Sequence, residues 1–292
     1  MLEGIIVKGI GGFYYVKTEE GVFQCRARGL FREENLVPTV GDRVIIQINK
    51  EDNTGYIKEI KPRISQLLRP PVANITQVII VMSIKKPNIN LWLLDRFLVM
   101  AEFERLDVHI CLNKVDLERE EEIAKINNIY KFAGYDIINT SIVENIGIEE
   151  LGDKLKDNIT VFAGPSGVGK SSLLNGIHPD LNLKTGDISK KTTRGKHTTR
   201  HVELINLASN SYVLDSPGFS SLDLGFIERE EDLANYFIEM KKHKDKCKFI
   251  SCVHFKEPDC EIKNQLEKGN ISRSRYDNYI SFLEEIKNIR RY

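Results

Sequence analysis

The sequence predicts a multidomain protein of three parts: an N-terminal five-stranded β-barrel, a central α/β domain and a C-terminal helical domain. Three observations predict this architecture. Short runs rich in β-branched and aromatic residues come first, strand patterns then alternate with amphipathic helical patterns, and helical patterns with a Cys/His-rich loop follow. We therefore expect domains over residues 1–63, 64–222 and 223–292.

Length and composition narrow the class of protein. A chain of 292 residues is long enough for about two domains with a sizeable core in at least one. Its 42 Lys plus Arg equal its 42 Asp plus Glu, so net charge favours neither nucleic acid nor membrane as a partner. The N-terminus lacks the apolar core of a signal peptide, and no run approaches the roughly 20 residues of a spanning helix. We expect a soluble, cytoplasmic protein and a monomer.

The N-terminal domain is predicted from five strand-like runs separated by glycine-containing turns. Five short strands suit a small closed barrel of the oligonucleotide-binding (OB) type, although a structural barrel of another type stays open. Basic residues around the turns, near Phe31, allow an RNA-facing surface or a merely solvated one. The five runs cover residues 4–9, 12–18, 21–27, 42–49 and 54–61, and the basic residues are Arg26, Arg28, Arg32 and Arg43.

The central domain is predicted from strands that alternate with helices, which is typical of a parallel sheet covered on both faces. Ligands of such sheets bind at the carboxyl ends of the strands. Asn113 follows one predicted strand and Gly164 ends another, so both lie at this edge. The predicted strands cover residues 77–83, 107–113, 135–141 and 159–164, and the predicted helices cover residues 91–105, 119–133 and 148–157.

The stretch "GPSGVGKSS" fits the phosphate-binding pattern G-x-x-x-x-G-K-[ST] without a gap, between an apolar strand and a helix-forming run. Glycines let backbone N–H groups surround phosphate oxygens, Lys170 would neutralise the β- and γ-phosphates, and the Ser171 hydroxyl would reach Mg²⁺. The alternative is a glycine turn that fits the pattern by chance.

A second motif, "NKVD", indicates guanine as the base. The Asp116 carboxylate can accept from both N1–H and the exocyclic amine of guanine, a donor pattern that adenine does not present. Asn113 and Lys114 would brace the loops around the base. Thr140 and Ser141 end the next strand and could offer a backbone N–H to the guanine oxygen.

A third motif, "DSPG", matches D-x-x-G and would put Asp215 behind the Mg²⁺ and the Gly218 N–H at the γ-phosphate. Thr199, rather than Thr198, is our candidate for the remaining Mg²⁺ contact. The base motif thus precedes the phosphate loop, whereas ordinary GTPases have the reverse order. We therefore predict a circularly permuted P-loop GTPase, because rotation is tolerated where domain termini lie close together.

The predicted GTP-binding residues are Asn113, Lys114, Val115, Asp116, Thr140, Ser141, Gly164, Pro165, Ser166, Gly167, Val168, Gly169, Lys170, Ser171, Ser172, Asp215 and Gly218, with Ser171 and Thr199 as the magnesium ligands.

The C-terminal domain is predicted to begin with a helix over residues 229–244 and to end with one over residues 272–292, with a Cys/His-rich loop between them. It is expected to hold one structural Zn²⁺. Three cysteines and one histidine in the pattern C-x₄-C-x-H-x₅-C suit a closed tetrahedral site, and the odd total of five cysteines argues against a disulfide framework. Reduced thiols in a loop are the alternative. Lysines around the first cysteine make a basic patch. Contact with RNA and simple exposure to solvent both stay open as its role. The predicted ligands are Cys247, Cys252, His254 and Cys260.

These features together resemble the bacterial ribosome small-subunit-dependent GTPase A family. The stretches "CRARGLFR", "LRPPVANITQ", "GPSGVGKSSLLN", "RGKHTTRHVEL" and "DSPGFSS" are similar to its motifs, and the resemblance covers essentially the whole chain. It implies a GTPase that binds rRNA, acts late in maturation of the small ribosomal subunit and is stimulated by that subunit. A nucleotide-gated RNA-binding checkpoint and a GTPase of another ribonucleoprotein stay open as alternatives.

The resemblance also implies a catalytic residue. Many GTPases carry Gln after the D-x-x-G glycine to orient the attacking water, but Phe219 stands there in this chain and cannot hydrogen-bond water. The family resemblance points instead to His197, whose neutral imidazole can accept a proton from water. The alternative is that His197 contacts only RNA or solvent.

Overall fold

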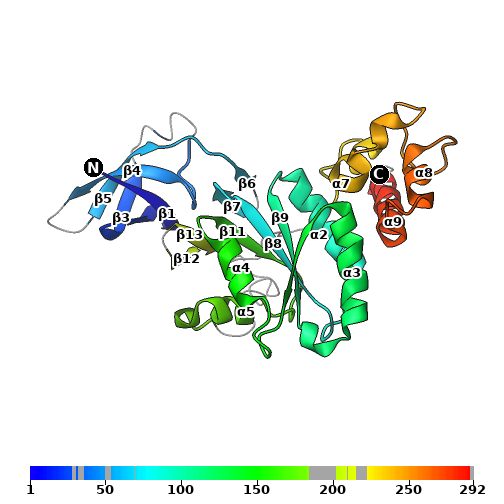
Figure 1. The fold of residues 1–292 in the computed structure, drawn as a ribbon. Helices are drawn as coiled ribbons and strands as arrows, with labels where there is room; N and C mark the ends of the chain where they lie inside the picture. Colours follow the sequence, from blue (N-terminus) through cyan, green and yellow to red (C-terminus); the bar gives the residue numbers. More distant parts are fainter. Residues whose placement is uncertain are drawn as a thin grey trace.

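The computed structural model describes residues 1–27, 31, 36–49, 54–68, 70–183, 202–208, 210–214 and 222–289, without the side chains of residues 68 and 208. The barrel lies at one end of the molecule and the C-terminal helices at the other, with the central sheet between them (Figure 1). Among the described residues, no helix is both long and apolar enough to cross a membrane.

The N-terminal domain is the predicted five-stranded barrel. Its strands close in the order β1-β2-β3-β5-β4, and their inward residues, among them Ile6, Val16 and Ile57, are fully buried. Phe31 is buried as well and belongs to the same apolar cluster as these residues. The strands are β1 (Leu2–Ile10), β2 (Phe13–Thr18), β3 (Gly21–Ala27), β4 (Arg43–Asn49) and β5 (Thr54–Ile60).

A short hairpin of β6 (Gln66–Leu68) and β7 (Pro71–Ala73) follows the barrel and packs against it. A Cβ on Gly41, whose φ is +91°, would lie 2.0 Å from the Ala73 carbonyl oxygen, so this close approach requires glycine. The fully buried Asp42 accepts from Arg63 Nε at 2.7 Å and from Nη2 at 2.8 Å. These contacts attach the hairpin to the barrel.

The central domain contains a six-stranded sheet of order β10-β9-β8-β11-β13-β12, and the parallel strands β8 to β11 match those predicted from the sequence. All neighbours are parallel except β12, which runs antiparallel to β13 at the edge. The strands are β8 (Gln77–Ser83), β9 (Asp107–Asn113), β10 (Asp136–Thr140), β11 (Ile159–Ala163), β12 (Leu204–Ala208) and β13 (Ser211–Leu214).

Side-chain alternation along β8 explains why the residues between its polar ends, Gln77 and Ser83, are all apolar. Val78 and Ile80 pack in the cluster that includes residues of α2 and α3, whereas Ile79 and Val81 pack in the cluster that includes residues of α4 and α5. A strand buried on both faces has no polar side. The helices are α2 (Leu91–Phe103), α3 (Glu120–Ala133), α4 (Ile148–Leu155) and α5 (Lys170–Ile177).

The C-terminal domain is helical, but its first predicted helix, over residues 229–244, is wrong in detail. Phe237 has an extended backbone (φ −113°, ψ 103°) and separates a 3₁₀ helix from a short α-helix. The Phe237 side chain is fully buried against Tyr279 and the guanidinium of Arg275, so tertiary packing overrides the helical propensity. The elements are η3 (Glu230–Tyr236), α7 (Ile238–Lys241), η4 (Lys244–Lys246), α8 (Glu261–Glu267) and α9 (Arg273–Ile289).

Candidate functional site

The carboxyl ends of the parallel strands meet at one edge of the central sheet and bring the sequence motifs together. Asn113 at the end of β9 is in register with Thr140 of β10 and with Ser83 of β8, and the phosphate loop begins at Gly164 after β11. Asn113 and Gly164, which are 51 positions apart in the chain, thus share one edge, as expected for ligand sites of such sheets.

The conformation of the phosphate loop requires its glycines. Gly164, Gly167 and Gly169 have φ values of +133°, +82° and +102°. A Cβ at Gly164 would lie 2.1 Å from the Val81 carbonyl oxygen, and one at Gly169 would lie 2.4 Å from Nδ2 of Asn113. A larger residue at Gly169 would therefore push the phosphate loop away from the base motif, and one at Gly164 would push it away from β8.

Lys170, the first residue of α5, points back over the loop. Its Nζ donates to the carbonyl oxygens of Gly164 and Pro165, both at 2.8 Å. The residue is only 5% exposed, and this burial lowers the pKa of Lys170 to about 8. A buried cation held only by carbonyl oxygens is poorly compensated, which favours an anion beside it.

Four side-chain hydrogen bonds join Asn113 and Lys114 of the base motif to neighbouring segments. Asn113 Nδ2 donates to the Val168 carbonyl at 2.7 Å, and Thr140 Oγ1 donates to Asn113 Oδ1 at 3.0 Å. Lys114, in the left-handed region with φ 62°, donates through Nζ to the carbonyl oxygens of Gly167, at 2.8 Å, and Lys86. The base motif and the phosphate loop therefore form one connected unit.

Asp116 is held by Ser141, whose Oγ donates to Asp116 Oδ1 at 2.6 Å. The backbone N–H of Ser141 donates to the Ile146 carbonyl at 3.0 Å. That N–H thus has a partner within the protein, while the Ser141 hydroxyl orients Asp116. The contact of a backbone N–H at Thr140 or Ser141 with the guanine oxygen stays a prediction.

Sequence reasoning did not single out the loop of residues 84–88, which lies beside both motifs. The Lys86 carbonyl accepts from Lys114, and a Cβ on Gly167 would lie 3.8 Å from Cδ of Pro87. The Ser83 hydroxyl donates to the Pro87 carbonyl at 2.6 Å and holds the loop on the end of β8. The only signal in the sequence is that "SIKKPN" follows a strand of the parallel sheet.

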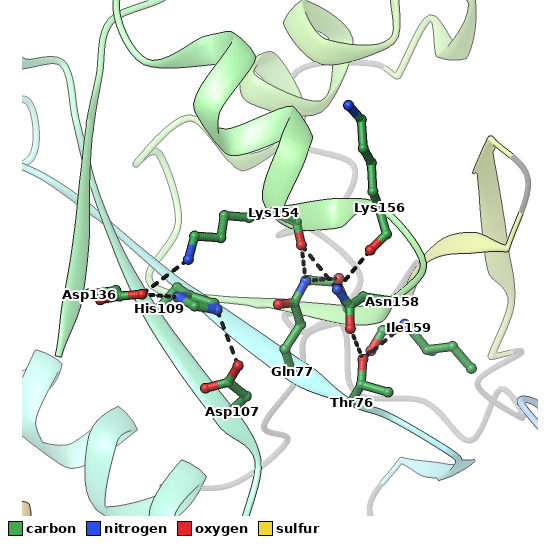
Figure 2. A network of polar contacts seen from close by, with 10 residues as sticks. Thr76, Gln77, Asp107, His109, Asp136, Lys154, Lys156, Asn158 and Ile159 are labelled. Atoms are coloured by element: carbon green, nitrogen blue, oxygen red, sulfur yellow. Dashed lines mark hydrogen bonds and ion pairs between the residues drawn. The ribbon is translucent and has the colours of Figure 1, made fainter.

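The opposite edge of the sheet has a polar network of its own (Figure 2). The buried His109 lies 3.5 Å from carboxylate oxygens of both Asp107 and Asp136, and Lys154 donates to Asp136 at 3.1 Å. Gln77 Nε2 donates to Thr160 at 2.8 Å and to the Lys154 carbonyl. These contacts join the beginnings of strands β8 to β11 to one another and to α4. The network therefore has a structural role.

Several predicted site residues lie outside the described part of the chain. They are His197, Thr198, Thr199, Asp215, Gly218 and Phe219. The remaining predicted nucleotide-site residues all lie at the carboxyl edge of the sheet. The residues of the base motif follow β9 into η1 (Val115–Leu117), and Thr140 and Ser141 lie at the end of β10. The phosphate loop continues into the start of α5 and includes Ser166, Ser171 and Ser172.

The four predicted zinc ligands converge, with their ligand atoms all within 4.8 Å of one another. His254 Nδ1 lies 3.5 Å from Sγ of both Cys247 and Cys260, whose sulfurs are 3.9 Å apart. Atoms bound at about 2.3 Å to one tetrahedral ion lie roughly 3.7 Å apart. Burial lowers the pKa of His254 to about 4, so the imidazole is neutral, as a metal ligand must be. This donor set fits Zn²⁺.

Helix α9 supports the loop that carries the cluster. The hydroxyls of Tyr276 and Tyr279 donate to the carbonyl oxygens of His254 and Val253, at 2.7 and 3.0 Å. Glu257 accepts from the backbone N–H groups of Val253 and Phe255, both at 2.9 Å. These contacts fix the backbone around the ligands, so the cluster belongs to the core of the C-terminal domain.

The chain is similar to known proteins over its whole length. Residues 3–57 match the family model of the RsgA N-terminal domain, and residues 60–225 match that of the RsgA GTPase. A protein of Alkaliphilus metalliredigens, named small ribosomal subunit biogenesis GTPase RsgA, is 50% identical over all of both chains. A protein of the same name from Caldanaerobacter subterraneus is 49% identical, over 98% of this chain and 96% of its own.

Two solved structures share this fold. That of YloQ, described as a circularly permuted GTPase, superposes with a TM-score of 0.82 at 39% identity, covering 99% of this chain and 96% of its own. That of YjeQ from Thermotoga maritima gives 0.83 at 38% identity, covering 98% of each chain. The predicted permuted order of the motifs is therefore confirmed.

Proposed function

Because this chain belongs to the RsgA family of GTPases, we propose that it hydrolyses GTP to GDP and phosphate in late maturation of the small ribosomal subunit. The observation that carries the proposal is the junction of the two motifs, in which Asn113 and Lys114 reach the carbonyl oxygens of Val168 and Gly167 at 2.7 and 2.8 Å. A base-recognition motif joined directly to a phosphate loop suits one nucleotide bound across both.

In this proposal each part of the site has one task. Asp116, oriented by Ser141, accepts from guanine, while the phosphate loop and Lys170 hold the phosphates. Ser171, and Thr199 of the segment outside the described residues, bind Mg²⁺, which offsets charge developing on the phosphoryl oxygens. Asp215 and Gly218 complete the γ-phosphate side.

The flanking domains would bind the partner, the small ribosomal subunit with its rRNA. Support comes from cations on both: Arg43 is exposed on the barrel, and Lys241, Lys242 and Lys246 lie close in sequence to the zinc ligands. Cations that pair with phosphates would make this binding salt-dependent. One structural Zn²⁺ holds the C-terminal domain, and the protein acts as a cytoplasmic monomer.

The proposal predicts slow intrinsic turnover and strong stimulation by the subunit. GTP turnover measured with and without purified small subunits, at two salt concentrations, tests it. Stimulation that weakens as salt rises supports the proposal. Turnover that is unaffected by small subunits but raised by large subunits would contradict it.

Asp116→Asn should exchange guanine for xanthine as the preferred base. The variant should bind GTP about 100-fold or more weakly, since hydrogen bonds to charged groups contribute roughly 1.5–3 kcal/mol each. It should bind xanthosine triphosphate better than the wild type does, because the xanthine C2 oxygen then faces an amide donor. Competition binding with GTP, ATP and xanthosine triphosphate measures both changes. Equal affinity of the wild type for ATP and GTP would refute the base assignment.

His197→Ala should keep nucleotide affinity and subunit binding but lose most of the stimulated rate, by about 100-fold, because positioned acid–base groups contribute roughly 10²–10⁴. Single-turnover hydrolysis on saturating subunits is the measurement. Lys196→Ala, one residue away, is the control: it should weaken subunit binding and leave the saturated rate unchanged. Full stimulated turnover in His197→Ala would mean that this histidine is only an RNA contact.

A further inference from the structure

Arg96 of helix α2 lies where three parts of the chain meet. Its side chain is buried, and its Nε donates to the carbonyl oxygen of Leu222. Its two terminal nitrogens donate to the Glu285 carboxylate of α9, at 2.5 and 2.6 Å. The guanidinium carbon also lies 4.9 Å from the ring centre of Trp92. One planar group thus serves two partners from distant parts of the sequence.

The two partners belong to different functional units. Leu222 is separated from the D-x-x-G motif, which ends at Gly218, by only three residues of sequence. Glu285 belongs to α9, whose Tyr276 and Tyr279 hold the loop of the zinc ligands. Arg96 therefore connects the chain immediately after a nucleotide motif with the zinc-binding domain.

Attachment of the C-terminal domain does not depend on Arg96. The neighbouring Asp95 accepts from Arg275 Nη1 at 2.7 Å and from Asn278 Nδ2 at 2.6 Å, both on α9. Arg275 also donates twice to Glu239, at 2.7 and 2.9 Å, within the protein interior. This second, fully buried connection already holds α9 on α2, so the contact of Arg96 with Leu222 is not needed as interdomain attachment.

The geometry of a guanidinium links the positions of Leu222 and α9. Its N–H groups lie in one rigid plane, so a rotation that follows one partner breaks the paired hydrogen bonds to the other. If the Leu222 carbonyl moved away, the buried Nε–H would lose its partner, which is costly. The guanidinium therefore favours one relative position of its two partners.

We infer that Arg96 is a positioning residue that couples the nucleotide state at the D-x-x-G side of the site to the zinc-binding domain. The inference rests on the proposed GTPase function and adds the route between the nucleotide and that domain. By reciprocity, a partner that binds and shifts α9 would change the affinity for GTP relative to GDP.

Hydrogen exchange of the α9 amides, in full-length protein bound to GDP or to a non-hydrolysable GTP analogue, tests this coupling. The wild type should show different protection of α9 with the two nucleotides. Arg96→Lys keeps the charge but has no planar fork, so the difference should shrink about fivefold or more, because such couplings are typically about 5- to 150-fold. If Arg96→Lys lowers the zinc content of the protein, the same measurement is made on the variant Glu285→Gln.

Ser281→Ala is the matched control. It removes the 3.1 Å hydrogen bond from Trp92 Nε1 to Ser281 Oγ in the same α2–α9 interface, without touching Leu222. It should respond to nucleotide as the wild type does. An α9 that ignores the nucleotide in the wild type, or that responds equally in Arg96→Lys, would overturn the inference while the proposed function stands. A wild type that binds neither nucleotide would overturn both.

Discussion

Lys170→Ala is expected to abolish GTP turnover, with a loss of at least about 1000-fold. Losses of this size are typical when a charge that stabilises a phosphoryl group during its transfer is removed. The physical reason is the position of Lys170: its Nζ lies over the loop, 2.8 Å from two carbonyl oxygens. In the proposed site this cation is the only Lys or Arg of the phosphate loop itself. Single-turnover hydrolysis at saturating GTP measures the loss.

The lowered pKa of Lys170 gives this prediction a pH dependence. In the free protein the ammonium loses its proton near pH 8, whereas a bound phosphate favours the charged form. GTP affinity should therefore be constant below about pH 8 and fall by up to about tenfold per pH unit above it. Lys170→Met should lack this dependence.

Lys170→Met should not destabilise the fold at pH 7. A lysine whose pKa is lowered by burial destabilises the folded state while it is charged. The cost is complete at pH values below the pKa in the folded state and is absent at pH values above the pKa in the unfolded state. Lys170→Met removes that cost, so its melting temperature should be unchanged or higher. Lys154→Ala, at the opposite edge of the sheet, is the control and should keep turnover. Normal hydrolysis by Lys170→Ala would mean that the phosphate loop is misassigned.

Loss of the metal should unfold the C-terminal domain. We expect one tightly held Zn²⁺ per chain, and its binding should be coupled to folding of this domain, since structural zinc sites bind with roughly 10–16 kcal/mol. Cys252 and Cys260 are buried and pack in the same apolar cluster as Tyr279. Without the metal, the loop that α9 holds through Tyr276 and Tyr279 would lose the ion that joins Cys247 to Cys260.

Cys260→Ala is the sharpest test. Metal analysis of protein purified without chelator should find about one zinc in the wild type and almost none in the variant, together with loss of α9 protection in hydrogen exchange. Cys25→Ala, a buried cysteine of the barrel, should keep its zinc. GTP affinity should survive in both variants. A zinc-free wild type with a folded C-terminal domain would refute the site.

Local patterns in the sequence predicted most of the fold. The alternation of apolar strands with helices identified the sheet, because a strand such as β8 is buried on both faces and carries no polar side. The helix expected over residues 229–244 was wrong, because burial of Phe237 against α9 outweighs local propensity and breaks it. Only the packed domain decides such a competition.

Within the candidate site, the sequence by itself predicted the chemistry: glycines for the phosphate loop, Asp116 for the base, and three thiolates with one imidazole for zinc. The roles of these residues stay predictions, as do those of His197, Thr199, Asp215 and Gly218 outside the described part. Tertiary structure alone decided which groups meet. Asn113 pairs with Val168, 55 residues away, and Arg96 pairs with Glu285, 189 residues away. Residue spacing cannot encode such contacts, because they depend on the order of strands in the sheet and on how α9 packs against α2.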